Sequence, residues 1–178
     1  MRKKLWMPLA AIALAALLLF AGYNGLMGLR LSVAQKELEE KMQTILPGSV
    51  TFTQEAYTGE DANIQQVYKG ETGYVVGTLT SGYAGNLAML IGVSNEGTVT
   101  GLQIRNMHET LGLGQEALTD WQFLAQFLNT TGDAAVGENI DAITGATVTS
   151  KAVTRSVNSA VCFVTGADAS SGATSWGG

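Results

Sequence analysis

The chain has 178 residues, of which 46% are hydrophobic and 14% charged, and fifteen Asp and Glu outnumber ten Lys and Arg. This length suits one domain with an anchor. The formal net charge of −5 argues against nucleic-acid binding, because such proteins neutralise phosphates with a basic surface. One cysteine and one histidine exclude a disulfide framework and argue against a zinc, cluster or haem site, so we expect no metal.

Residues 5–29 form an uncharged, apolar run of 25 residues, and residues 1–4 before it contain Arg2, Lys3 and Lys4. A membrane-spanning helix needs about 20 apolar residues. By the positive-inside rule, residues 1–4 face the cytoplasm and the remainder crosses to the outer side. We therefore expect a single-pass protein of the inner or plasma membrane, in contact with lipid. The alternative is a cleaved secretory signal, although the apolar run exceeds the usual core of about 7–15 residues.

Residues 30–48 are predicted to form a stalk helix leaving the membrane. Apolar residues recur there at helical spacing among charged ones, and Pro47 and Gly48 end the pattern. The apolar positions are Leu31, Ala34, Leu38, Met42 and Ile45.

Residues 49–165 are predicted to form an extracytoplasmic α+β domain. Residues 51–66 are polar and are expected to be irregular. Three β-type runs follow, over residues 74–79, 87–93 and 98–104, with turn residues between them. Short connections of this kind favour hairpins and hence an antiparallel sheet.

Two helices are predicted after the strands. Residues 115–128 place one apolar stripe toward the core, made of Leu118, Trp121, Leu124, Ala125 and Leu128. Phe123 and Phe127 lie on the other side, so both faces of this helix can be covered. Residues 149–164 bury a second face, made of Val153, Val157, Ala160, Val161 and Val164, with Cys162 packed beside it. Residues 166–178 are rich in Gly, Ser and Ala and are expected to form a flexible tail.

A run of small and hydroxyl residues, 141–150, lies directly before the last predicted helix. Gly145 and Ala146 let a ligand approach the backbone, and the hydroxyls of Thr147, Thr149 and Ser150 suit a phosphate at the positive end of the helix. The alternative is an ordinary helix start with Thr149 or Ser150 as its cap.

This run resembles the flavinylation motif D-x-x-(S/T)-G-A-T of the FMN-binding domain family. The motif positions are Asp141, Thr144, Gly145, Ala146 and Thr147, and the following Val148, Thr149 and Ser150 also match. The resemblance implies that a flavin transferase attaches FMN to Thr147 through a phosphoester. It also implies that Asp141 is needed by the transferase and that the rest of the run, including Thr149 and Ser150, contacts the cofactor.

A second family signature, usually E-T-P-G-L-G, resembles residues 109–114. Glu109, Thr110 and Gly112 match, whereas Leu111 replaces the proline. The resemblance implies flavin contacts from these four residues, with a turn that Leu111 loosens. His108 precedes them, and a loop histidine of this kind is more often solvated than a proton donor.

The order of features is most similar to the G subunit of Rnf complexes within this family, and it covers nearly the whole chain. That similarity implies an electron-carrier subunit, with no independent catalytic site, in a complex that couples ferredoxin:NAD electron transfer to Na⁺ or H⁺ translocation. Its partners would be the other integral membrane subunits and the flavin transferase.

Three other interpretations of the sequence stay open. The chain could be a stand-alone anchored FMN-binding protein of an extracytoplasmic electron-transfer chain. It could instead be similar to the C subunit of the sodium-pumping NADH:quinone oxidoreductase. The third is a non-redox binding module whose Gly/Thr loop only caps a helix.

The tail contains a second match to D-x-x-(S/T)-G-A-T, from Asp168 to Thr174. No helix pattern follows it, and small residues are abundant there. Because such composition produces the match by chance, we expect Thr147 rather than Thr174 to carry the flavin.

Overall fold

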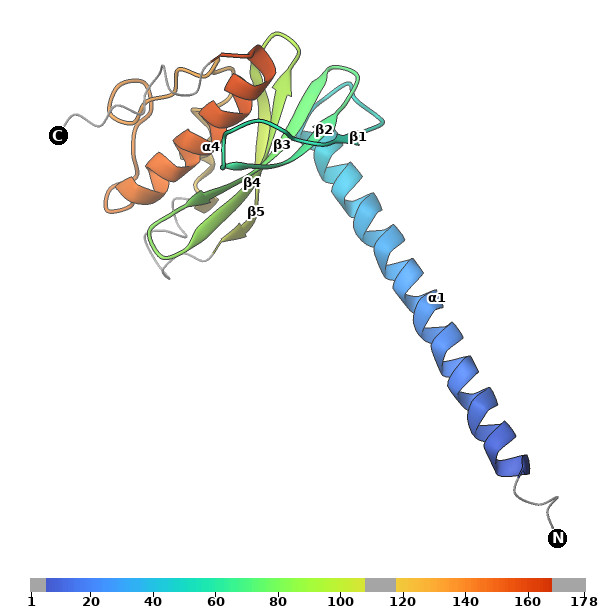
Figure 1. The fold of residues 1–178 in the computed structure, drawn as a ribbon. Coiled ribbons are helices and arrows are strands. Elements are labelled where there is room, and N and C mark those ends of the chain that lie inside the picture. Colours follow the sequence, from blue (N-terminus) through green and yellow to red (C-terminus); the bar gives the residue numbers. More distant parts are fainter. Residues whose placement is uncertain (1–5, 108–117, 168–178) are drawn as a thin grey trace. The chain divides into compact units, whose positions relative to one another are not determined.

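The computed structural model describes residues 6–107 and 118–167, and the chain divides into two compact units, residues 1–40 and 41–178 (Figure 1). One helix, α1, covers Trp6–Ile45 and accounts for all described residues of the first unit. Among the described residues, no helix combines the length and the apolar character that crossing a bilayer requires. The predicted stop at Pro47 and Gly48 is confirmed, since α1 ends at Ile45.

The second unit contains an antiparallel sheet of five strands in the order β1-β2-β3-β4-β5. The strands are β1 (Thr53–Glu55), β2 (Ile64–Lys69), β3 (Gly73–Ser81), β4 (Asn86–Ser94) and β5 (Val99–Met107). The predicted α+β class and the antiparallel meander of the last three strands are confirmed.

The prediction that residues 51–66 are irregular is wrong, because β1 and the start of β2 lie there. A register shift between Ile64 and Gln66 interrupts the pairing of β2 with β3. The bulge breaks the alternation of buried and exposed side chains by which a strand is recognised. All three residues of β1 are exposed, so its sequence carries no apolar pattern at all.

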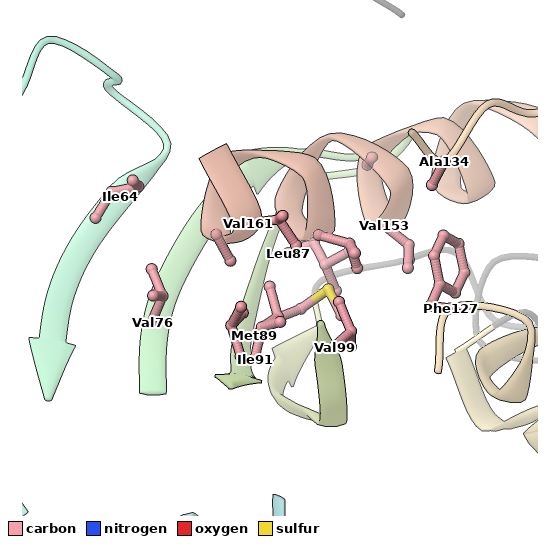
Figure 2. Packing of buried hydrophobic residues seen from close by; sticks show 14 of the residues in the cluster. Ile64, Val76, Leu87, Met89, Ile91, Val99, Phe127, Ala134, Val153 and Val161 are labelled. Carbon is pink, nitrogen blue, oxygen red and sulfur yellow. The ribbon is translucent and has the colours of Figure 1, made fainter. Parts of the chain in front are cut away.

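Helix α4 (Thr147–Thr165) packs on β3 and β4 and forms the main core with them. Figure 2 shows Val76, Met89 and Ile91 of the sheet beneath Val153 and Val161 of the helix. Among the residues predicted for the buried face, Val153, Val157, Ala160 and Val161 are fully buried, and Val164 and Cys162 are half-buried. Gly166 ends the helix in a left-handed conformation, with φ of 69°.

The opposite face of the sheet is covered by the end of α1. Met42, Ile45 and Leu46, which belong to the second unit, are at most 4% exposed. Ile91 and Val93 belong to the core beneath α4, so Gly92 between them faces the other side. A Cβ atom on Gly92 would lie 2.2 Å from the Ile45 carbonyl oxygen, which shows how closely the two backbones approach.

The single helix predicted over residues 115–128 is wrong in extent, and its predicted stripe is buried only in part: Leu118 is buried, whereas Leu128 is exposed. Residues 115–117 lie outside the described part of the chain, and a short helix, α3, covers Trp121–Ala125. The Asp120 carboxylate accepts hydrogen bonds from the backbone N–H groups of Gln122 and Phe123 and so begins the helix anew. Phe123 and Phe127 are buried with their rings 5.3 Å apart, whereas Trp121 is 73% exposed.

Candidate functional site

Residues 141–146 form a turn that leads directly into α4. The Ala146 backbone N–H donates to the Ile143 carbonyl at 2.9 Å, which closes the turn. Gly145 has φ of +80°, a conformation that L side chains rarely adopt, so glycine is required at this position. The tight turn sets Thr147 as the first helical residue.

The first turn of α4 has no side-chain cap. Its N-cap residue is Ala146, and the first backbone bond within the helix runs from the Ser150 N–H to the Ala146 carbonyl at 2.9 Å. The N–H groups of residues 147–149 therefore have no acceptor within the helix. The alternative that Thr149 or Ser150 caps the helix is wrong, because both residues lie inside it.

The motif residues differ in their exposure to solvent. Asp141, Thr144, Gly145 and Thr147 are exposed, whereas Ala146 is only 5% exposed. The polar side chains of Asp141, Thr144 and Thr147 are thus accessible from the solvent.

Ser150 and Thr149 lie beneath this exposed turn. The Ser150 hydroxyl donates to the Ala146 carbonyl at 3.0 Å and accepts from the Ile143 N–H at 3.3 Å, so it links Ile143 to Ala146 at the end of the turn next to α4. Thr149 is 1% exposed, and its Oγ1 atom is buried without a hydrogen-bond partner among the described residues. A buried hydroxyl without a partner costs free energy, and Thr78 Oγ1 and Gln103 Oε1 in the sheet share this property.

The beginning of the motif is held by Gln126, which sequence reasoning did not identify. Its Oε1 atom accepts from the Asp141 N–H at 2.7 Å, and its Nε2 donates to the Asp141 carbonyl at 3.3 Å. No pattern in the sequence links these two residues, because they come together only when α3 packs beside the loop.

The structure brings together seven of the predicted site residues in the turn and the first turn of α4: Asp141, Thr144, Gly145, Ala146, Thr147, Thr149 and Ser150. The second signature, Glu109, Thr110, Leu111 and Gly112, lies outside the described residues, as do His108 and Thr174. Within residues 6–107 and 118–167, no group of three or more His, Cys, Asp or Glu side chains could hold a metal ion.

The lowered carboxylate pKa values lie away from this turn in the sequence. Hydrogen bonds lower the pKa of Glu71, chiefly one from the Thr51 hydroxyl, and the Ser94 hydroxyl lowers the pKa of Glu96. Both groups belong to turns of the sheet, in the β2–β3 and β4–β5 connections.

Comparison with known proteins identifies the family. The FMN-binding domain family matches residues 82–162. The G subunit of the ion-translocating oxidoreductase complex of Methanosarcina acetivorans is 34% identical over 168 residues, which cover 85% of this chain and 88% of that protein.

Two further relatives match over a shorter region. The G subunit of the Na⁺-translocating ferredoxin:NAD⁺ oxidoreductase complex of Acetobacterium woodii is 42% identical over 110 residues, or 54% of this chain. The G subunit of the proton-translocating ferredoxin:NAD⁺ oxidoreductase complex of Clostridium ljungdahlii is 41% identical over 99 residues, or 52%. In both cases the match spans 53% of the relative's length. With the relative from Methanosarcina matched over most of its length, the resemblance is confirmed: the chain belongs to the family of G subunits of ion-translocating oxidoreductase complexes and contains an FMN-binding domain.

Proposed function

We propose that the chain is the electron-carrier subunit of an Rnf-type complex and carries FMN covalently on Thr147. The observation that supports this most directly is the exposed Thr147 hydroxyl at the uncapped start of α4, within a complete flavinylation motif. When bound, FMN supplies the redox chemistry, and the protein supplies its position and surroundings.

The residues around Thr147 fit a phosphate-bearing cofactor. The unpaired N–H groups of the first helical turn and the positive end of the helix dipole favour an anion there. The unpartnered Thr149 hydroxyl provides a buried donor close by in the sequence. Ser150 plays another part, because its only O–H is already donated to the Ala146 carbonyl, so it shapes the turn.

The attachment step needs an activated flavin donor. A phosphate ester of Thr147 would release water if it formed from FMN itself, which is unfavourable in aqueous solution. A flavin dinucleotide holds the same phosphate in a pyrophosphate. The Thr147 oxygen forms a bond to that phosphorus, the bond to the bridging oxygen breaks, AMP leaves, and the hydroxyl proton is released to solvent. No oxidation or reduction accompanies the transfer.

The remaining site residues complete the proposal. Asp141 is exposed beside the acceptor and is proposed to be recognised by the transferase. Thr144, Gly145 and Ala146 give the cofactor close access to the backbone. Glu109, Thr110, Leu111 and Gly112 are proposed to contact the flavin on the grounds of their sequence signature.

The role in a complex is supported by the relatives' names. Those from Acetobacterium and Clostridium are subunits of ferredoxin:NAD⁺ oxidoreductases that translocate Na⁺ or protons. We propose that this chain passes electrons in a complex of that class, with integral membrane subunits as partners. The protein then needs no catalytic group of its own.

A membrane anchor over residues 5–29, with the flavin domain outside the cytoplasm, is also proposed. Its support is the uncharged run of 25 residues that follows Arg2, Lys3 and Lys4. In α1, the successive residues 17–20 are each 63–75% exposed. Four consecutive positions point to all sides of a helix, and a helix that is apolar all round is stable in lipid.

Mass spectrometry of the full chain, produced with a flavin transferase, tests the attachment. Combined cleavage after Lys, Arg and Glu separates the two motif copies into peptides 139–151 and 156–178. We expect one FMN on peptide 139–151, retained in Thr147→Ser and lost in Thr147→Val. An adduct only on peptide 156–178 would show that the acceptor is wrong, and no adduct with a transferase active on a control protein would support the non-redox binding module.

Thiol labelling in intact cells tests the topology. Glu60→Cys and Lys3→Cys, each in a Cys162→Ala background, place single thiols in the domain and before the apolar run. A membrane-impermeant maleimide is expected to label only the first. Equal protection of both thiols contradicts the proposed orientation. Co-purification of integral membrane subunits then separates the Rnf-type role from a stand-alone carrier.

A further inference from the structure

The Gln126 side chain forms hydrogen bonds with both backbone polar groups of Asp141, the first residue of the motif. The Asp141 N–H donates to Gln126 Oε1 at 2.7 Å, and the Asp141 carbonyl accepts from Gln126 Nε2 at 3.3 Å. A side-chain amide offers one acceptor and a donor pair, so only one orientation of this amide satisfies both bonds. These two hydrogen bonds have the same pattern as the pair of N–H···O bonds that one residue of an antiparallel sheet exchanges with the residue opposite it.

Gln126 is the last of three side-chain amides that bond to the backbone of the loop leading into the motif. Asn158 of α4 makes the same reciprocal pair with the Ala134 backbone, at 3.3 and 2.8 Å. Asn139 accepts from the Ala135 N–H at 2.7 Å and donates to the Asp133 carbonyl at 2.9 Å. Backbone hydrogen bonds to the Ala135 and Ile140 carbonyls close the middle of the loop, and the side-chain amides hold the residues on either side of it.

The two bonds from Gln126 use only the backbone of Asp141 and leave its carboxylate accessible from the solvent. The backbone of Asp141 is held by Gln126, while its side chain is exposed and its carboxylate has no hydrogen-bond partner among the described residues. Ser150 fixes the other end of the turn. The Asp141 carboxylate at the start of the turn and the Thr147 hydroxyl at the start of α4 are thereby held at the two ends of the turn.

We infer that Gln126 is a positioning residue for the modification of Thr147: it holds the acceptor loop in the one shape that the transferase binds. This inference rests on the proposed flavinylation. When a protein populates its binding-competent shape only in part, the apparent affinity falls by that fraction. Loss of Gln126 therefore raises the KM of the transferase for the acceptor protein and leaves kcat nearly unchanged.

Two variants of Gln126 and a matched control test this inference. Gln126→Leu keeps the approximate shape and loses both bonds, and Gln126→Asn keeps the amide but is one methylene too short to reach both groups. The control, Gln122→Leu, changes an exposed glutamine within α3, the helix whose C-cap is Gln126. Two net hydrogen bonds correspond to a KM about tenfold higher for Gln126→Leu, with a smaller rise for Gln126→Asn and none for the control.

Hydrogen exchange at the Asp141 amide gives a second readout, which a general loss of stability does not mimic. It is expected to accelerate in Gln126→Leu, while exchange of the core amides of β4 stays slow. A folded Gln126 variant with a KM within twofold of wild type overturns the inference. If Gln126→Leu does not fold, Gln126→Asn decides by the same criterion. If wild-type protein itself takes up no flavin, the proposed function fails instead, so the two failures are distinguishable.

Discussion

The carbonyl oxygen of Ile45, the last residue of α1, accepts a hydrogen bond of 2.6 Å from the Thr100 hydroxyl on β5. Carbonyl groups in the last turn of a helix lack partners within the helix. Thr100 thus satisfies one of them from across the sheet. The contact lies within the second unit, where the end of α1 covers one face of the strands.

Thr100→Val removes this bond without changing the size of the side chain. Because the Ile45 carbonyl is left unpaired, we expect the free energy of unfolding to fall by about 1–3 kcal/mol. Urea denaturation followed by circular dichroism measures the change. Thr98→Val, which alters a threonine hydroxyl with no contact to α1, is expected to stay within about 0.5 kcal/mol of wild type. Equal effects in both variants contradict the role given to Thr100.

Gly92→Ala and Gly101→Ala test the close approach of α1 to the sheet. An added Cβ would lie 2.2 Å from the Ile45 carbonyl oxygen in the first variant and 2.7 Å from the Ile45 Cα in the second. These neighbours are backbone atoms and cannot rotate away, so we expect a loss of about 1–3 kcal/mol or more. Gly22→Ala serves as control, since nothing lies within 4 Å of its added Cβ. If Gly92→Ala or Gly101→Ala unfolds with the same free energy as wild type, the close approach of Ile45 to the sheet is contradicted.

The buried side of the α3 region can be tested with two aromatic residues. Phe127 is fully buried against Phe123, whereas Trp121 is 73% exposed. Phe127→Ala is expected to cost about 3–5 kcal/mol and Trp121→Ala less than about 0.5 kcal/mol. Denaturant midpoints at constant slope give both values. A larger loss of stability for Trp121→Ala than for Phe127→Ala would show that the stripe predicted from helical periodicity, and not the phenylalanine side, faces the core.

Thr149→Val separates the cofactor's contribution from that of the fold. In the flavin-free protein the Thr149 hydroxyl is buried and unpartnered, so its replacement by a methyl group is expected to preserve stability or to raise it by about 1 kcal/mol. In protein flavinylated on Thr147 as proposed, the same change is expected to lower the melting temperature relative to flavinylated wild type. Melting temperatures of both forms, with Val148→Ala as exposed control, provide the comparison. An identical shift in both forms would exclude a contact between Thr149 and the cofactor.

Acidification is expected to weaken the junction between α1 and the sheet through Glu71. Its carboxylate accepts from the Thr51 hydroxyl at 2.7 Å and from the N–H groups of Val50 and Thr51, and these bonds lower its pKa. A lowered folded-state pKa means that the stabilisation is present above the unfolded value of about 4.3 and is lost as the pH falls through the folded value.

Glu71→Gln should therefore differ from wild type most near neutral pH, and the difference should shrink below about pH 4. Denaturation across a pH series measures it. Glu60→Gln, an exposed carboxylate with no hydrogen bond among the described residues, is the control. Some acid dependence remains in the variant, because Ser94 lowers the pKa of Glu96 as well. A difference that grows on acidification would contradict a lowered pKa for Glu71.

Local patterns in the sequence predicted the elements whose burial is regular. Strands β3 to β5 and helix α4 follow their apolar periodicity, and the acceptor motif is contiguous in the chain. β2 escaped prediction because its bulge changes the phase of the alternation, and α3 because Asp120 begins a new helix. Gln126 could not be found from sequence, since its partner lies fifteen residues away and a side-chain amide carries no periodic signature.

The serine beneath the turn implies that the seven-residue motif is an incomplete description of an acceptor. Its exposed positions form the part that an enzyme can read, whereas Ser150, three residues beyond Thr147, supplies the scaffold by bonding to Ile143 and Ala146. In the second copy the equivalent of Ser150 is Gly177, which has no hydroxyl. A search for flavin acceptors that extends the pattern by this one position would accept residues 141–150 and reject the tail.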